Sequence, residues 1–208
     1  MARLSIFPLA GALLFPRAHL PLHIFEPRYR ALVTDAMARD RRIGMIQPRD
    51  GQSHRPTLFE VGCVGRISDI EALDDGRFNI VLEGVSRFRL VKELEVSTPF
   101  RQVEADWEPF AGDAVIPDPL ALVMRADLER EAKRYAEAKG YAIDWEAVSR
   151  LDDESLVNGV AQVAPFDTAS KQALLEAPDM ASRADLVVQF LRFFRLGEED
   201  DGHGATLQ

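Results

Sequence analysis

Hydrophobic and polar residues alternate most regularly between residues 60 and 91. Phe78, Ile80 and Leu82 fall on one face of an extended chain, with the period of two that a half-buried strand imposes. Residues 74–76 (Asp-Asp-Gly) precede them, and Asp-Gly is a strong hairpin signal because glycine adopts a positive φ freely. This segment therefore predicts two or three antiparallel strands, including 61–67 and 70–73, against which the rest of the chain packs.

The same alternation continues after Gly84, which breaks its phase as a bulge or bend would. Phe88 and Leu90 alternate with Arg87 and Arg89. The two arginines are therefore expected to lie in water or to face a partner.

The flanking segments predict further strands and one early helix. Short apolar or alternating runs predict strands at residues 4–9, 20–25, 43–46 and 100–107. Glu26-Pro27 predicts a helix start, because proline suits the first helical position and a carboxylate complements the exposed amides. An apolar stripe from Tyr29 to Met37 predicts that this helix lies on the sheet. Residues 1–110 are thus expected to form an open, barrel-like β domain.

The second half of the chain has the pattern of a helical bundle. Residues 111–119 contain one glycine and two prolines and predict a linker. A long helix is predicted from Asp118-Pro119 to Lys139-Gly140, with Asp118 as its cap and Glu129–Lys133 as a surface pair. Three shorter helices are predicted at 154–164, 168–177 and 181–196. We expect a helical extension over 111–197 and a disordered acidic tail over 198–208.

Charge is distributed unevenly between these halves. The net charge is −9, but residues 1–110 hold 15 basic and 15 acidic side chains, whereas 111–208 hold 10 and 19. The acidic half argues against a general nucleic-acid role, because phosphate binding requires a basic face. Fourteen of the 15 basic residues in the first half are arginine, so RNA binding stays open as an alternative to solvated strand faces.

Composition also bears on the compartment. No apolar run approaches the ~20 residues needed to span a bilayer. The first apolar segment is too short for a secretion signal. The single cysteine, Cys63, excludes an internal disulfide and fits a reducing compartment. We therefore predict a cytoplasmic protein without membrane association.

The chain has few residues with catalytic or metal-binding potential. His19 and His23 are four residues apart, but Pro21 lies between them and no third ligand is near in sequence. Cys63 lies on a predicted central strand without a neighbouring histidine in sequence, so a buried structural thiol is favoured over a nucleophile. No nucleotide fingerprint or serine elbow occurs. We predict no catalytic residue, no cofactor and no metal.

Several motifs resemble a known family in order and spacing. They are Phe15-Pro16, residues 20–30 (LPLHIFEPRYR), 61–65 (VGCVG), 76–88, and 163–167 (VAPFD) followed by 171–176 (KQALLE). Together they resemble the amino-terminal substrate-binding domain of the Lon ATP-dependent proteases. The resemblance implies a PUA-like β domain with a helical extension, and a role in recognising damaged or unfolded proteins.

The resemblance stops before catalysis. The ATPase module of Lon needs a phosphate loop ending in Gly-Lys-Thr/Ser, but the four lysines here follow Val, Ala, Ala and Ser. We therefore expect a stand-alone substrate-binding domain that lacks the ATPase and protease modules and is not an enzyme.

The most distinctive polar cluster is His23, Glu26, Arg28, Tyr29 and Arg30. In the structural interpretation, Glu26 caps the helix, Tyr29 packs on the sheet and the arginines tether carboxylates. In the functional interpretation, the arginines rim an apolar groove near residues 20–25. The peptide-binding residues predicted on this basis are Leu20, Leu22, His23, Phe25, Arg28 and Arg30.

Three functions follow as hypotheses. The first is a non-catalytic module that binds exposed apolar segments of unfolded or partly folded polypeptides, with an extended client added to a sheet edge. The second is an adaptor that recognises one folded partner, such as a Lon-type protease. The third is RNA binding.

The aromatic residues Phe190, Phe193 and Phe194 surround the last predicted helix, so one of them is expected to be exposed. A homo-oligomer also stays open.

Overall fold

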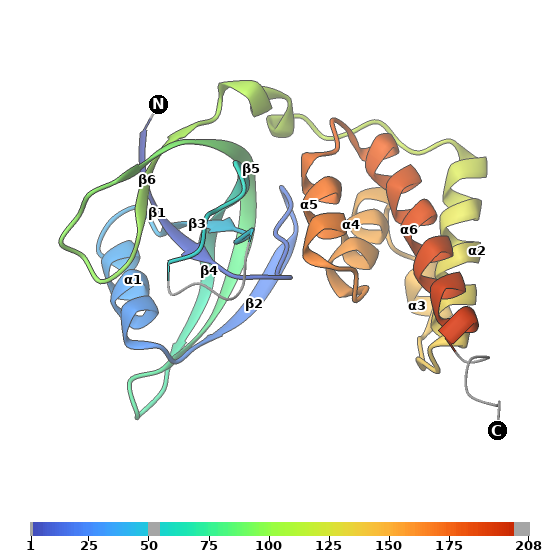
Figure 1. Ribbon diagram of the computed structural model, residues 1–208, viewed down its shortest axis with the longest axis horizontal. Coiled ribbons are helices and arrows are strands. Elements are labelled where there is room, and N and C mark those ends of the chain that lie inside the picture. Colours follow the sequence, from blue (N-terminus) through green and yellow to red (C-terminus); the bar gives the residue numbers. More distant parts are fainter. Residues whose placement is uncertain (1, 50–54, 202–208) are drawn as a thin grey trace. The chain divides into compact units, whose positions relative to one another are not determined.

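The structure is a computed structural model that describes residues 2–49 and 55–201 (Figure 1). The chain divides into two compact units, Met1–Ile116 and Pro117–Gln208. The first unit holds the sheet and the second holds helices, so the predicted α+β organisation is confirmed.

Six strands build the described part of the first unit. In chain order they are β1 (Ala2–Pro8), β2 (His19–Ile24), β3 (Arg42–Ile46), β4 (Val61–Ala72), β5 (Phe78–Leu94) and β6 (Gln102–Asp106). Their order is β2-β5-β4-β3-β1-β6, and β6 also pairs with β5. Five strands therefore form a closed ring, visible in Figure 1, with β2 added outside it along β5.

The sequence predicted an open, barrel-like domain, and in the structure the long strand β5 helps the strands to close into a ring. The 17 residues of β5 serve two neighbours in turn, because residues 78–83 pair with β2 and residues 89–94 pair with β6. The pairing with β4 shifts between Val64 and Gly65 and again between Ile67 and Asp69. Such irregularities bend a strand and increase its twist. The two predicted strands at 61–67 and 70–73 are consequently one bent strand, β4.

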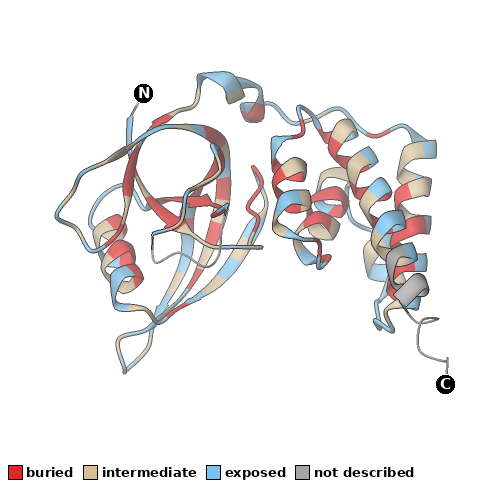
Figure 2. Cartoon of the chain, in the orientation of Figure 1, coloured by how far each residue is buried: buried red, intermediate tan, exposed pale blue. Residues whose placement is uncertain are grey.

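The central hairpin agrees with its sequence pattern. Gly76 has a φ of 77° in the turn between β4 and β5, and Ile80 and Leu82 are buried while Asn79 is exposed. The interior of the ring holds Leu4, Ile6, Ile46, Val64, Phe88, Val103 and Ala105. Figure 2 shows these buried positions as red bands along the strands.

Helix α1 (Pro27–Met37) begins with the predicted proline and packs its apolar side on the sheet. The ring centroid of Tyr29 lies 4.0 Å from that of Phe7 in β1. The prediction that Glu26 caps this helix is wrong at the level of the side chain. Glu26 occupies the cap position without a side-chain cap bond, because its carboxylate accepts a hydrogen bond from Arg28 instead.

The first unit ends six residues later than the predicted boundary at 110. The 3₁₀ helix η1 (Glu108–Ala114) brings Asp113 to Arg87, and their side chains are only 8% and 7% exposed. Arg87 Nη2 lies 2.7 Å from Asp113 Oδ1, and the backbone amide of Arg87 donates to Asp113 Oδ2 at 2.8 Å. Part of the predicted linker is thus attached to β5, and Arg87 is buried with a partner while Arg89 is exposed.

Within the residues that the structure describes, five helices build the second unit: α2 (Leu122–Ala138), α3 (Trp145–Ser149), α4 (Asp153–Val163), α5 (Thr168–Glu176) and α6 (Met180–Asp201). Asp144, Asp152 and Asp167 cap α3, α4 and α5 by accepting backbone N–H bonds. The helix end at Lys139-Gly140 is as predicted, with Gly140 at a φ of 70°. None of the described helices is both long and apolar enough to cross a membrane.

Two helix boundaries in the second unit differ from those predicted. Helix α2 starts after Ala121 rather than at Asp118, and the backbone amide of Leu120 donates to Asp153 at 2.8 Å. Helix α6 continues to Asp201, so residues 198–201 extend a helix where a tail was expected. The rest of the expected tail, 202–208, lies outside the described residues.

Candidate functional site

The sheet of the first unit has one outer strand, β2. It pairs antiparallel with β5 from His19–Glu83 to Ile24–Phe78, and β5 is its only strand partner within the described part of the chain. The opposite edge of β2 therefore presents backbone groups that no other described strand pairs. Such an edge is a template for an additional strand.

The side chains of β2 divide between its two faces. Leu20 and Leu22 are half-buried and stand opposite Leu82 and Ile80, whereas His23 on the other face is exposed. Phe25 follows the strand and is 60% exposed. The predicted apolar residues at 20–25 thus lie along the free edge, with Phe25 as the most accessible.

His23 is held in a polar network on the β2–β5 surface. Its Nδ1 lies 2.7 Å from Asn79 Oδ1, and Asn79 in turn donates to Glu71 at 2.7 Å. Its Nε2 lies 3.2 Å from a guanidinium nitrogen of Arg77, which also pairs with Asp75. The hydrogen bond from Arg77 holds the pKa of Asp75 below its ordinary value. This network holds the imidazole against the sheet through both of its ring nitrogens.

The two predicted arginines make contacts within the unit. Arg28 pairs with Glu26 at 2.8 Å and its guanidinium lies 4.5 Å from the ring centroid of Tyr29. Arg30 lies against the turn at Gly76, where a Cβ would collide with its guanidinium. Arg28 is exposed beside β2, whereas Arg30 supports the hairpin. A peptide site made of Leu20, Leu22, His23, Phe25, Arg28 and Arg30 stays a prediction.

Many arginines of the β unit are already paired with carboxylates. Besides Arg87, these pairs include Arg66–Glu83 at 2.6 Å and Arg101–Glu93 at 2.8 Å. The hydrogen bond from Arg101 keeps the pKa of Glu93 below its ordinary value. Paired arginines offer less net charge to a phosphate backbone.

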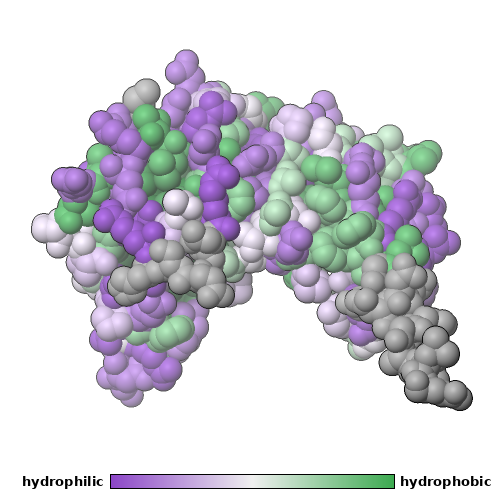
Figure 3. Space-filling model, in the orientation of Figure 1, coloured by the Kyte–Doolittle hydropathy of each residue, from purple (hydrophilic) through white to green (hydrophobic). Residues whose placement is uncertain are grey.

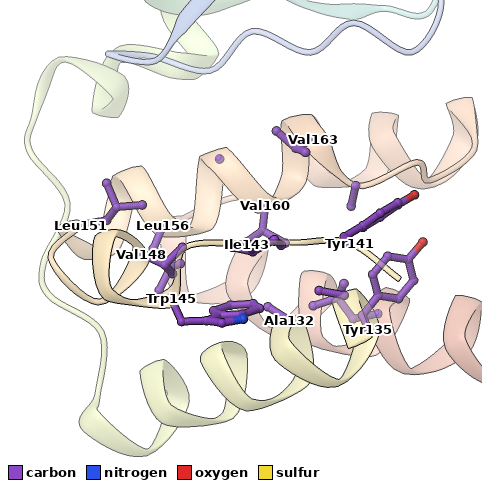
Figure 4. A pocket seen from close by; sticks show the side chains of 14 residues that line it. Ala132, Tyr135, Tyr141, Ile143, Trp145, Val148, Leu151, Leu156, Val160 and Val163 are labelled. Carbon is purple, nitrogen blue, oxygen red and sulfur yellow. The ribbon is translucent and has the colours of Figure 1, made fainter. Parts of the chain in front are cut away.

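The second unit contains an apolar pocket that the sequence did not predict. Its volume is about 310 Å³, and it lies between α2, α3, α4 and the segment that joins α2 to α3 (Figure 4). Its lining is entirely apolar or aromatic and includes Tyr135, Tyr141, Ile143, Trp145, Val148 and Val160. Tyr141 is 50% exposed and Val163 at the rim is 84% exposed, so the pocket is open to solvent.

The sequence did carry a signal for this pocket. Tyr141, Ile143, Trp145, Val148 and Leu151 place five large apolar residues within a segment assigned to no element. A solvated loop would not need them. In the structure this segment includes the short helix α3, which the sequence analysis missed.

Buried polar groups in the second unit serve packing. Lys171 donates to the carbonyl of Gln162 at 3.1 Å, and burial lowers the pKa of its ammonium. Arg183 donates to Leu174 and Asn158. The side chain of Glu131 in α2 is 3% exposed, and its Oε1 lies 3.6 Å from Nε of Arg192 in α6. These contacts hold the bundle and none of them points to chemistry on a substrate.

Residues that were weighed for metal binding or catalysis lie as follows. His19 and His23 are both exposed on β2, and Cys63 is buried in β4. Over residues 2–49 and 55–201, no three His, Cys, Asp or Glu side chains form a group able to hold a metal ion. The absence of metal, cofactor and catalytic residues stays a prediction.

Figure 3 adds the distribution of hydropathy on one face of the molecule. Hydrophobic residues gather on the visible face of the helical unit among hydrophilic ones. On α6, Phe193 is 68% exposed, so the prediction that one of its aromatic residues is exposed is confirmed.

Comparison with known proteins finds Lon proteases as relatives. Lon protease 2 of Myxococcus xanthus is 28% identical over 193 residues, which cover 90% of this chain and 23% of that protein. Lon protease 2 of Sorangium cellulosum is 29% identical over 200 residues, with 88% and 24% covered. The chain therefore spans about a quarter of the length of these relatives.

A solved structure has the same fold. The Lon N-terminal domain protein from Xanthomonas campestris matches with a TM-score of 0.64 at 21% identity, covering 91% of this chain and 99% of that one. The family model for the ATP-dependent protease La (LON) substrate-binding domain matches residues 3–192. Since this match includes both units, the chain belongs to the LON substrate-binding domain family.

Proposed function

We propose that this chain is a non-catalytic module that binds exposed apolar segments of unfolded or partly folded polypeptides. Membership of the LON substrate-binding domain family supports a role in substrate recognition. The observation that carries the proposal is the outer strand β2, which has β5 as its only strand partner in the described residues and apolar side chains along its length.

In this proposal, an extended client segment pairs with the free edge of β2. Backbone hydrogen bonds supply sequence-tolerant affinity, and alternate side chains of the client contact Leu20, Leu22 and the exposed ring of Phe25. Pro21 has no amide hydrogen, so one donor is missing from the edge. His23 and Arg28 would contact polar groups of the client, and His23 would do so by exchanging one of its hydrogen bonds to Asn79 or Arg77.

The expected affinity is modest. An unfolded client loses conformational freedom when it pairs with a strand, and this cost offsets much of the contact free energy. We expect a dissociation constant on the order of micromolar. Weak, tolerant binding suits a module that samples many clients.

Fluorescence anisotropy with a labelled, permanently unfolded polypeptide tests the proposal. Phe25→Ser should weaken binding several-fold, because Phe25 is 60% exposed and its loss costs the fold little. Val91→Ser is the matched control, since Val91 is 45% exposed on the part of β5 that pairs with β6 rather than β2. Absence of any anisotropy change up to high protein concentration would defeat the proposal.

An adaptor that recognises one folded partner is the second candidate. Phe193 and Leu196 of α6 are 68% and 52% exposed, as a contact surface for a folded protein would be. A pull-down that yields one stoichiometric partner, lost on Phe193→Ser, would favour the adaptor. A salt-sensitive gel shift would instead favour RNA, against which the paired arginines of the β unit argue.

A further inference from the structure

A second pocket, lined in part by charged residues, adjoins the apolar pocket of the second unit. Its volume is about 270 Å³, and it shares Trp145 and Val148 with the apolar pocket, so the two adjoin along α3. The charged residues that line this second pocket come from one face of α2 and are Glu129, Arg130 and Lys133. A ligand that occupies both pockets therefore meets carbon on one side and charge on the other.

The ion pairs of α2 determine which of these charges is available. Glu129 pairs with Arg125 at 2.9 Å, so the predicted Glu129–Lys133 pair is wrong. Arg130 pairs with Asp127 at 2.6 Å. Lys133 is exposed and takes part in no ion pair with a residue that the structure describes. Its ammonium is the unneutralised charge beside the apolar pocket.

The shape of the apolar pocket limits its occupant. A hollow of about 310 Å³ has room for one or two protruding side chains, whereas a flat protein surface would leave it empty. Its lining offers no charged partner, so the inserted group is uncharged. The adjoining Lys133 favours a carboxylate close to that group.

We propose that this pocket is a second client subsite, which takes a large apolar side chain of a polypeptide while Lys133 receives an acidic residue next to it in the client. The inference rests on the proposed polypeptide-binding function but places a separate site in the helical unit. It gives the module a preference for apolar residues flanked by Glu or Asp.

Gly159 of α4 allows the pocket to be filled without disturbing the fold. It lines the pocket, and a Cβ added there meets nothing within 4 Å. Gly159→Leu therefore places a side chain in the open space, and it also improves helix propensity. Gly159→Ala is the matched control, because one methyl group leaves most of the pocket empty.

The test uses three labelled, unstructured peptides that differ only in the residue after a single phenylalanine, which is Glu, Gln or Lys. Anisotropy with the full chain should rank them Glu, Gln, Lys from tightest to weakest, with steps of about two- to fivefold because the charge pair is exposed. Gly159→Leu should weaken all three about tenfold or more, since burial of the ring is lost. Lys133→Glu should reverse the ranking.

Each outcome bears on one claim. If the peptides bind but Gly159→Leu equals Gly159→Ala, while Phe25→Ser still weakens binding, the second subsite is wrong and the edge-strand proposal stands. If no peptide binds the unaltered chain, the polypeptide-binding function itself fails. If the ranking persists in Lys133→Glu, the acidic preference is wrong. If Gly159→Leu changes only the sedimentation coefficient, the occupant is a second copy of the chain and the proposal is overturned.

Discussion

A Cβ atom added at a glycine would have opposite consequences in the strands of the β unit and in the helical unit. In the β unit, a Cβ at Gly84 would overlap the carbonyl oxygen of Phe15, and one at Gly62 would lie 2.5 Å from that of Met45. In the helical unit, a Cβ at Gly159 meets nothing within 4 Å. The strands are closely packed at these two glycines, while the bundle keeps an apolar pocket beside Gly159.

This difference indicates how each unit can recognise a partner. A closely packed sheet cannot admit a foreign side chain into its interior, so its available element is the backbone edge of β2. The bundle has its helical backbone groups satisfied internally and offers a pocket for side chains instead. In the two proposals, the β unit would bind mainly the main chain of a client and the helical unit would bind one of its side chains.

The largest effect is expected from Asp113→Ala. The variant leaves the guanidinium of Arg87 buried without its carboxylate, which costs about 3–5 kcal/mol of unfolding free energy. Because Trp107 lies in the β unit and Trp145 in the helical unit, single-tryptophan variants report each unit separately. Urea unfolding followed by Trp107 should shift strongly, and that followed by Trp145 much less.

A control for Asp113→Ala separates charge from packing. Adding Arg87→Met removes the unpaired charge and should recover part of the loss. Equal shifts of the unfolding midpoints followed by Trp107 and Trp145 would mean that the two units unfold as one. The two units would then not differ in their stability.

The next effect is Gly84→Ala, a single methyl group in the filled unit. The collision is with backbone, which no side-chain rotation relieves, so we expect a loss of about 3 kcal/mol. Gly112→Ala in the same unit is the control, because its Cβ meets nothing within 4 Å. A midpoint for Gly84→Ala within error of Gly112→Ala would contradict the close packing of β5 against residue 15.

Local patterns explain which parts of this fold the sequence could predict. The β4–β5 hairpin follows from Asp-Gly and from the alternation at Ile80 and Leu82, which are local signals. The aspartate caps and Gly140 likewise act over three or four residues. How the ring closes could not be predicted from local patterns, because closure depends on β1 pairing with both β3 and β6, and Ala2 lies opposite Ala105.

A candidate site could be proposed from the sequence only where its residues are contiguous. Residues 20–25 were singled out as one stretch, and the structure places them on the free edge of the sheet. The helical pocket combines α2, α3 and α4, so no single stretch contains it. The alternation of residues 87–90 placed Arg87 in water or against a partner protein, whereas it is buried against Asp113. Local alternation could not show this, because Asp113 is 26 residues away in sequence.

A smaller effect, confined to the helical unit, is expected from Asp153→Asn. Hydrogen bonds from Arg125 and from the Leu120 amide hold the pKa of Asp153 below its ordinary value of 3.8. A lowered carboxylate pKa contributes stability above the ordinary value and loses it as the pH falls through the folded value. The variant should be less stable by about 1 kcal/mol at pH 7, and the difference should be lost as the pH falls below 3.8 and through the lowered pKa.

Glu146→Gln is the control for this pH dependence. Glu146 also pairs with an arginine, Arg150, but their side chains are 78% and 71% exposed. Water screens such a pair, so its loss should leave the unfolding midpoint followed by Trp145 unchanged at either pH. A constant difference between Asp153→Asn and the unaltered chain from pH 7 to pH 2 would show that Asp153 acts through neutral hydrogen bonds alone.

The smallest effect has the opposite sign. Gly159→Ala, the same change that damages the β unit at residue 84, should stabilise the helical unit by about 0.5–1 kcal/mol, because alanine loses less backbone entropy in a helix and its methyl group meets no neighbour. Unfolding followed by Trp145 measures it, with the Trp107 signal unmoved. Destabilisation at Gly159 would mean that the hollow closes in solution, and the pocket could then not hold a client side chain. Stabilisation by Gly159→Ala together with destabilisation by Gly84→Ala would show that the two units differ in free volume at these positions. In the two proposals, free volume is the property that separates main-chain recognition from side-chain recognition.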